Sequence, residues 1–125
     1  KPGETARAHV RFWAALNGRT VKEAEYALDR VGLIRPANVV GRGLSAGQRR
    51  RIALARLILS RRAVWLLDEP GAALDAEGRA LLGQLIADHA AQGGLTIAAV
   101  HDVLPAPVSR EVEIAARGSH PVCVS

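Results

Sequence analysis

The stretch GRGLSAGQRRRIALARLILSRRAVWLLDEPGAALD, residues 41–75, determines the predicted architecture of this chain. Ser45 is a natural helix N-cap, and apolar residues follow it at helical spacing, which predicts a helix that begins at the serine. Residues 63–67, AVWLL, form an unbroken apolar run with acids at its end. Such a run is typical of a strand that is covered on both faces in a parallel sheet.

The next residues complete a strand, helix, strand unit. After the break at Pro70 and Gly71, residues 76–92 carry leucines at helical spacing, and two glycines follow them. LTIAAV, residues 95–100, is a second buried strand that ends at His101. A βαβ unit requires a right-handed crossover and a mainly parallel sheet, so the predicted fold class is α/β.

Two short helices are predicted before this unit, within residues 4–17 and 20–32. Gly18 and Gly32 end them, and Thr20 with Glu23 forms a capping box at the start of the second. In the tail, residues 105–125, EVEIAA is a possible short strand, and the remainder is predicted to be irregular.

Composition and charge narrow the classes of protein. The 125 residues correspond to about one domain, and the net charge is +5. Seven arginines and no acid lie between Arg42 and Arg62. This block could face nucleic acid, anionic lipid or a phosphorylated ligand, but on charge alone a solvated helix face is favoured. Cys123 is the only cysteine, which excludes an internal disulfide and fits a reducing compartment.

The ends of the sequence carry no membrane or export signal. No apolar run approaches the roughly 20 residues that span a bilayer, and the first residues, KPGETARAHV, lack an apolar signal-peptide region. The sequence does not begin with Met, which suggests a truncated or processed chain.

Functional side chains follow both predicted strands. Asp68 and Glu69 end the first strand and His101 ends the second, so they should lie close together at the edge where parallel sheets bind ligands. In phosphoryl transfer, the first carboxylate can support Mg²⁺ and the second can activate the attacking water. The alternative is that the acids begin a surface loop and that His101 is an ordinary polar cap.

The serine turn is a second candidate site. A helix N-terminus exposes unpaired N–H groups and a partial positive charge, and Ala46 and Gly47 let a ligand approach the backbone. The turn could therefore cradle an anion. The alternative is simple helix capping by Ser45.

The motifs and their order resemble those of the ABC-type ATPases over almost the whole chain. LSAGQ resembles the signature motif LSGGQ, with Ala46 in place of the first glycine. VWLLDEP is similar to the Walker B strand, ALD at residues 73–75 to the D-loop, and His101 to the switch histidine. The resemblance implies a P-loop NTPase-like parallel sheet core with a helical subdomain, incomplete at its N-terminus. Residues 1–62 would be the helical subdomain with the signature motif, 63–104 the core and 105–125 a tail.

The resemblance also implies roles for the matching residues, with ATP and Mg²⁺ as cofactors. Asp68 would support Mg²⁺, Glu69 would activate water, and His101 would hold the γ-phosphate. The signature turn would act across a dimer, on ATP that is held by a second ATPase subunit. The residues implied at that interface are Ser45, Ala46, Gly47, Gln48 and Asp75.

One part of the family pattern is missing from the sequence. The lysines are Lys1 and Lys22, and neither follows a Gly-rich P-loop of the form G-x-x-x-x-G-K-[ST]. The chain therefore resembles the C-terminal portion of a subunit, and we expect the 125 residues alone to be inactive toward ATP.

Within the family, the stretch VRFWAALNG and the arginine-rich helix before a Trp-containing strand most resemble the ATP-binding subunit of the haem exporter of cytochrome c biogenesis. This resemblance implies a peripheral subunit on the cytoplasmic face of the bacterial inner membrane. It would bind transmembrane permease subunits, touch the membrane through them only, and energise haem export.

Two alternatives stay open. One is the ATPase of another ABC importer or exporter, or a soluble ABC protein. The other, of a different class, is a basic nucleic-acid-binding module, which would use the arginine block on phosphates. Such modules also use aromatic stacking residues, and Trp65 lies inside the predicted strand instead. We therefore expect no nucleic-acid partner.

Overall fold

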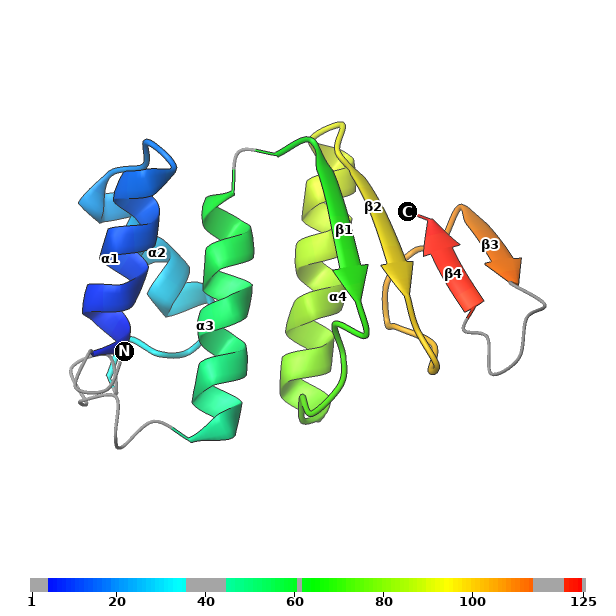
Figure 1. Ribbon diagram of the computed structural model, residues 1–125, viewed down its shortest axis with the longest axis horizontal. Helices are drawn as coiled ribbons and strands as arrows, with labels where there is room; N and C mark the ends of the chain where they lie inside the picture. The colour runs from blue at the N-terminus through cyan, green and yellow to red at the C-terminus, as the bar shows by residue number, and fades with distance from the viewer. Residues whose placement is uncertain (1–4, 36–44, 61, 114–120, 125) are drawn as a thin grey trace. The chain divides into compact units, whose positions relative to one another are not determined.

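The computed structural model describes residues 5–35, 45–60, 62–113 and 121–124 of the chain (Figure 1). The chain divides into two compact units, residues 1–61 and 62–125. The first unit is helical, and the second is built around a sheet. Among the described residues, no helix is both long enough and apolar enough to cross a membrane.

Three helices form the first unit: α1 (Ala6–Leu16), α2 (Val21–Arg30) and α3 (Ala46–Leu59). A hydroxyl caps each of the first two, because Thr5 Oγ1 accepts a hydrogen bond from the Ala8 N–H at 3.0 Å and Thr20 Oγ1 accepts one from Glu23 at 3.1 Å. Gly18 and Gly32 follow these helices with φ angles of 65° and 74°, which side chains rarely adopt. The predicted helices and their glycine stops are confirmed.

The predicted capping box of α2 is only half present. Thr20 caps the helix, but the Glu23 carboxylate accepts a hydrogen bond from the Arg19 guanidinium at 3.1 Å, and the box is not completed. Arg19 also donates to the carbonyl oxygens of Leu59 and Ser60, at 3.2 and 3.3 Å. Glu23 therefore helps to hold an arginine that joins the start of α2 to the end of α3.

The core of the first unit consists of small and branched side chains between the three helices. Trp13 adds a polar link, since its indole N–H donates to the Arg56 carbonyl oxygen at 3.3 Å and its ring lies 4.1 Å under the Arg56 guanidinium. The core residues include Val10, Ala14, Ala24, Leu28, Val31, Ile52, Ala55 and Leu59. The apolar faces of α1, α2 and α3 thus pack against one another.

The second unit contains β1 (Val64–Asp68), α4 (Ala76–Ala91), β2 (Leu95–Ala99), β3 (Arg110–Glu113) and β4 (Pro121–Val124). The strand order is β1-β2-β4-β3. β1 and β2 are parallel, with Val64 opposite Leu95 and Asp68 opposite Ala99, which confirms the predicted strand, helix, strand unit. β3 includes the first residues of the predicted short strand EVEIAA. The rest of the tail was predicted to be irregular, and β4 shows that this prediction was wrong. β4 pairs antiparallel with both neighbours, so the sheet is mixed.

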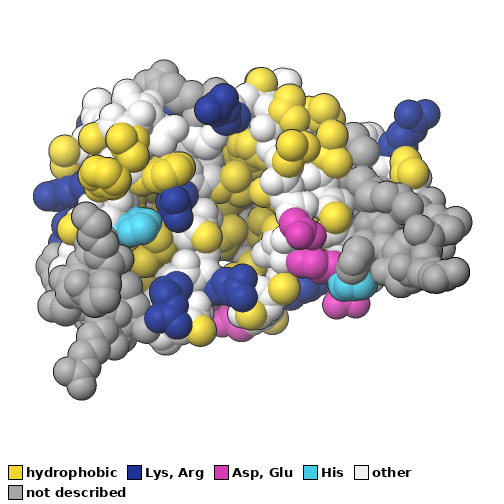
Figure 2. All heavy atoms as spheres, viewed as in Figure 1, with side chains coloured by type: hydrophobic (Ala, Val, Ile, Leu, Met, Phe, Trp, Pro, Cys, Tyr) yellow, Lys and Arg dark blue, Asp and Glu magenta, His cyan; other side chains and the backbone are white. Residues whose placement is uncertain are grey.

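The prediction that β1 is covered on both faces was also wrong for the described residues. Trp65 is 8% exposed and its ring stacks on His89 of α4, whereas the next residue, Leu66, is 75% exposed. Side chains alternate between the two faces of a strand, and α4 covers one face (Figure 1). Figure 2 shows hydrophobic side chains gathered over β1 and β2 on the opposite face.

Candidate functional site

Glu69 directly follows β1, in a loop that its own backbone organises. Its N–H donates to the Ala99 carbonyl oxygen at 2.8 Å, which extends the pairing of β1 with β2 by one residue. Its carbonyl oxygen accepts a hydrogen bond from Ala72 at 3.0 Å. The φ angle of Glu69 is 46°, a left-handed conformation that costs a non-glycine residue about 1–3 kcal/mol and is concentrated at functional sites. The loop holds Glu69 in this conformation by hydrogen bonds on both sides.

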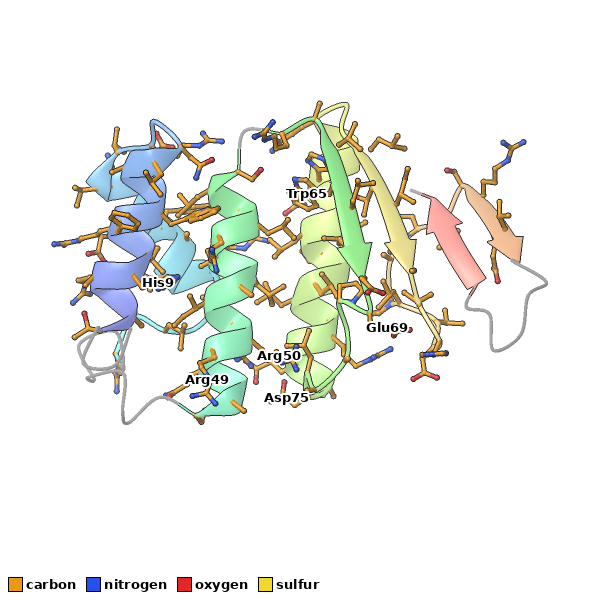
Figure 3. All side chains as sticks on the ribbon, viewed as in Figure 1. His9, Arg49, Arg50, Trp65, Glu69 and Asp75 are labelled. Carbon is orange, nitrogen blue, oxygen red and sulfur yellow. The ribbon has the colours of Figure 1, made fainter. Side chains whose placement is uncertain are left out.

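The structure brings Glu69 and His101 together, as the sequence predicted. Glu69 Oε1 lies 3.4 Å from His101 Nε2, with the side chains 30% and 59% exposed, respectively. Asp68 is the last residue of β1, and its side chain is exposed. Figure 3 shows Glu69 at the carboxyl end of β1, and Figure 2 shows acidic and histidine side chains gathered at this end of the second unit. The arrangement places a carboxylate and an imidazole next to each other at the end of the sheet.

An open pocket of about 220 Å³ lies beside this pair. Its wall combines the loop after β1, the loop after β2 and one residue of α4. The lining residues are Glu69, Gly71, Ala72, Arg79, Val100, His101, Asp102 and Leu104. The two loops therefore form one pocket, lined by both charged and apolar residues, at the carboxyl ends of the parallel strands, where open α/β sheets bind ligands.

Asp75 caps α4. Its Oδ1 accepts a hydrogen bond from the Gly78 N–H at 2.7 Å, and the Asp75 carbonyl oxygen accepts one from Arg79 at 2.9 Å. Ala73, two residues earlier, has a φ angle of 60°. A nucleotide contact by Asp75 stays a prediction.

The serine turn is a complete capping box at the start of α3. Ser45 Oγ accepts a hydrogen bond from the Gln48 N–H at 3.0 Å, and Gln48 Oε1 accepts one from the Ser45 N–H at 2.8 Å. The N–H groups of Ala46 and Gly47 have no acceptor inside the helix, and both residues are exposed. The Ser45 hydroxyl proton is not used by the box, because the oxygen acts as the acceptor. The turn thus presents three donors to an anion such as phosphate.

Two of the five described arginines in this block make contacts inside their own unit. Arg51 Nη1 donates to the Val31 carbonyl oxygen at 3.0 Å, and the Arg56 guanidinium lies over Trp13. Arg49 and Arg50 project from the first turns of α3 (Figure 3). Two arginines of the helix therefore stabilise the packing of the first unit, which weakens the nucleic-acid alternative.

Arg79 is a pocket residue that the sequence reasoning missed. It lies on α4 and its guanidinium donates to the carbonyl oxygens of Gly71, at 3.4 Å, and Val103, at 2.9 Å. The signal in the sequence was an arginine four residues after the Asp75 cap, one helical turn from the predicted site. Spacing alone does not show which carbonyl groups such an arginine meets.

Asp68 and the Ser45 turn are the groups that could bind Mg²⁺ and the phosphates of ATP. In the described ranges, no group of three or more His, Cys, Asp and Glu side chains is placed to hold a metal ion. Asp68 offers one exposed carboxylate, which suits Mg²⁺, because this ion retains waters and takes one or two carboxylates with phosphate oxygens. The donors at Ser45, Ala46 and Gly47 suit a phosphate group. Asp68 therefore fits one position around Mg²⁺, and the Ser45 turn fits a phosphate group.

The family profile described as "ABC transporter" matches residues 1–72. Among curated relatives, the "Cytochrome c biogenesis ATP-binding export protein CcmA" of Hyphomonas neptunium is 50% identical over 114 residues, which is 91% of this chain and 58% of the relative. The protein of the same name from Bradyrhizobium diazoefficiens is 46% identical over 114 residues, 91% of this chain and 56% of the relative. The chain thus spans a little over half the length of these relatives.

Solved structures are similar as well. A chain in the crystal structure of archaeal ribosomal stalk protein aP1 with ribosome recycling factor aABCE1 matches with a TM-score of 0.68 and 25% identity, over 97% of this chain and 24% of that chain. An RNase-L inhibitor matches with a TM-score of 0.58 and 26% identity, over 78% and 19%. Because the family profile matches more than half of the residues, the chain belongs to the ABC transporter family.

Proposed function

We propose that the chain is part of an ABC transporter subunit that hydrolyses ATP, with Glu69 and His101 in the reacting centre. The observation that carries this proposal is the 3.4 Å approach of Glu69 Oε1 to His101 Nε2 beside an open pocket. Family membership supports it, because the stretch matched by the profile includes both the Ser45 turn and Glu69. ATP hydrolysis by the complete subunit is the predicted activity.

Three side chains at the carboxyl ends of β1 and β2 carry the proposed chemistry. The Glu69 carboxylate orients a water molecule and takes its proton as the water oxygen bonds to the γ-phosphorus and the bond to the ADP oxygen breaks. His101 Nε2 lies beside Glu69 Oε1 and donates its hydrogen to a γ-phosphate oxygen, which keeps the phosphate next to the carboxylate that activates the water. Asp68 would support Mg²⁺, which supplies positive charge to the phosphate oxygens when it is bound.

The Ser45 turn serves a second nucleotide in this proposal. The hydroxyl of Ser45 and the N–H groups of Ala46 and Gly47 bind the γ-phosphate of ATP held by a second ATPase subunit, while Gln48 keeps the turn in shape through the capping box. Asp75 communicates between the two subunits. The active form is then a dimer of ATPase subunits.

The relatives suggest the cargo and the location. We propose that the subunit energises the export of haem for cytochrome c biogenesis, because relatives up to 50% identical are named as export proteins of that process. In that role it lies on the cytoplasmic face of the bacterial inner membrane. It contacts the membrane through transmembrane permease subunits.

The experiment joins this chain to the N-terminal part of the Hyphomonas relative, which supplies the rest of the subunit. We expect the purified chimera to hydrolyse ATP, and Glu69→Gln to reduce kcat by about 100-fold or more, because the general base is lost. ATP binding should persist. The matched control is Glu111→Gln, an exposed acid on β3, which should leave kcat unchanged. Hydrolysis that survives Glu69→Gln would falsify the assignment of the base.

A second arm tests the cargo. The chimera should restore c-type cytochromes to a strain that lacks its own CcmA, and the Glu69→Gln variant should not. If the chimera hydrolyses ATP but restores no cytochrome, haem export is wrong and the ATPase assignment stands.

A further inference from the structure

Arg79 lies in the wall of the pocket and contacts both loops that carry the reacting side chains. Its Nη2 donates to the Val103 carbonyl oxygen at 2.9 Å, and its Nη1 donates to the Gly71 carbonyl oxygen at 3.4 Å. Gly71 is two residues after Glu69, and Val103 is two residues after His101. One guanidinium therefore bridges the two loops from α4, the helix that packs beneath them.

Gly71 lies close to the Arg79 guanidinium. A Cβ atom added at Gly71 would lie 2.8 Å from Arg79 Nη1 and 3.1 Å from Leu104 Cδ2, and Gly71 is buried. The φ angle of Gly71 is not in the left-handed region, so backbone freedom does not require a glycine there. An alanine at this position would press on the guanidinium, the mobile end of the Arg79 side chain, and on Leu104.

The chemistry of the contact requires an arginine. A guanidinium is planar and presents its N–H donors in a fixed fork, so it can hold two carbonyl groups at a set separation. A lysine ammonium is a compact donor on a flexible stem, and it does not fix the distance between two acceptors. Arg79 is half-buried, and its contact with the Gly71 carbonyl is partly shielded from water, whereas its contact with the Val103 carbonyl is exposed.

We propose that Arg79 is a positioning residue that sets the separation of Glu69 and His101 by fastening their two loops together. This inference rests on the proposed function, since it assigns Arg79 to the same pocket. The hydrogen bonds of Arg79 are to the backbone carbonyl groups of Gly71 and Val103, and it acts through them. Glu69 retains its own strained turn, and the arginine keeps that turn at the right distance from the His101 loop.

The test compares kcat with KM in the chimera. Arg79→Ala should lower kcat by about 10- to 100-fold, the cost of a displacement of about 1 Å, and change the KM for ATP by less than about 3-fold. Arg79→Lys should fall between Arg79→Ala and wild type. Gly71→Ala, which displaces the guanidinium but keeps its charge, should lower kcat in the same direction. Arg110→Ala, at an exposed arginine on β3, is the matched control and should change neither constant.

A double-mutant cycle separates positioning from general stability. If Arg79 acts by placing the two loops, its removal should cost little once His101 is gone, so Arg79→Ala with His101→Ala should be within about 3-fold of His101→Ala alone. Two fully additive losses would overturn the proposal, as would a wild-type kcat in Arg79→Ala. If Arg79→Ala does not fold, the same cycle is run with Arg79→Lys and Gly71→Ala.

The two proposals fail differently. If Glu69→Gln and His101→Ala leave hydrolysis unchanged, the proposed function is wrong. If those variants are inactive while every Arg79 and Gly71 variant retains wild-type kcat and KM, only the positioning role is wrong.

Discussion

The Ser45 turn and the Glu69 loop are both candidate sites for phosphate chemistry, but they are built in different ways. The Ser45 turn is made by residues within one helical turn, and its two capping hydrogen bonds join Ser45 to Gln48. The Glu69 loop depends on Ala99, His101 and Arg79, which lie 10 or more residues away in the sequence. The difference teaches that a capped helix turn can be encoded by neighbouring residues, whereas a pair of a carboxylate and an imidazole needs a folded sheet.

The largest effect should come from breaking the pair between the loops. His101→Ala in the chimera should reduce kcat by about 100-fold, because a group that holds both the phosphate and Glu69 is lost. The measurement is steady-state ATP hydrolysis with purified protein. His89→Ala is the matched control, since His89 stacks on Trp65 away from the pocket; a wild-type kcat in His101→Ala would contradict the assignment.

The next largest effect should be on the stability of the second unit, which carries the Glu69 loop. Gly83 is buried within α4, and a Cβ there would overlap the Pro105 carbonyl group. Gly83→Ala should therefore destabilise the chain by about 1–3 kcal/mol, although alanine favours helices. Urea unfolding measures this change. Gln84→Ala, at an exposed neighbouring position, should stay within about 0.5 kcal/mol of wild type.

Substitutions of Ser45 test whether its turn binds phosphate or only caps α3. They should have a smaller effect on stability and a separate effect on ATP hydrolysis. Ser45→Ala removes the cap and should destabilise α3 by about 1 kcal/mol. Ser45→Asp retains a capping oxygen, so its stability should stay near wild type, but it places a negative charge toward the phosphate. Both variants should slow hydrolysis by the chimera. If Ser45→Asp hydrolyses ATP like wild type, the turn is only a helix cap.

The smallest effect concerns Glu25 on α2 of the helical unit. Burial acts to raise the pKa of the Glu25 carboxyl, but hydrogen bonds from Arg11 and Arg7, with their positive charges, outweigh it and lower the pKa below its ordinary 4.5. The Arg11 and Arg7 contacts are 2.7 and 2.8 Å long. A lowered pKa means that Glu25 stabilises the fold above pH 4.5 and loses this contribution as the pH falls through the folded-state pKa.

Glu25→Gln tests this sign. The variant should be less stable than wild type at pH 7, by a small amount because the pair is partly exposed, and the difference should shrink at pH values below 4.5. Unfolding measured at several pH values checks it. A difference that grows toward low pH would contradict the stated sign.

Much of the fold followed from local patterns. The starts of the helices were predictable because Thr20, Ser45 and Asp75 cap the backbone within three residues of themselves. The predictions that were wrong concerned contacts between residues far apart in the sequence. Leu66 looked buried because its strand is uniformly apolar, yet only one face of β1 packs against α4, and β4 had no signal because its pairing depends on β2 and β3.

The sequence by itself determined the elements, the order of the motifs and the identity of the chemical groups: Ser45 before a helix, Asp68 and Glu69 after one strand, and His101 after the next. These features are local, so a few neighbouring residues encode each of them. Only the tertiary structure decided that Glu69 adopts a left-handed conformation, that it lies 3.4 Å from His101, and that Arg79 joins their loops. The physical reason is that these distances arise from strand pairing and helix packing, which bring together backbone groups that sequence spacing does not relate.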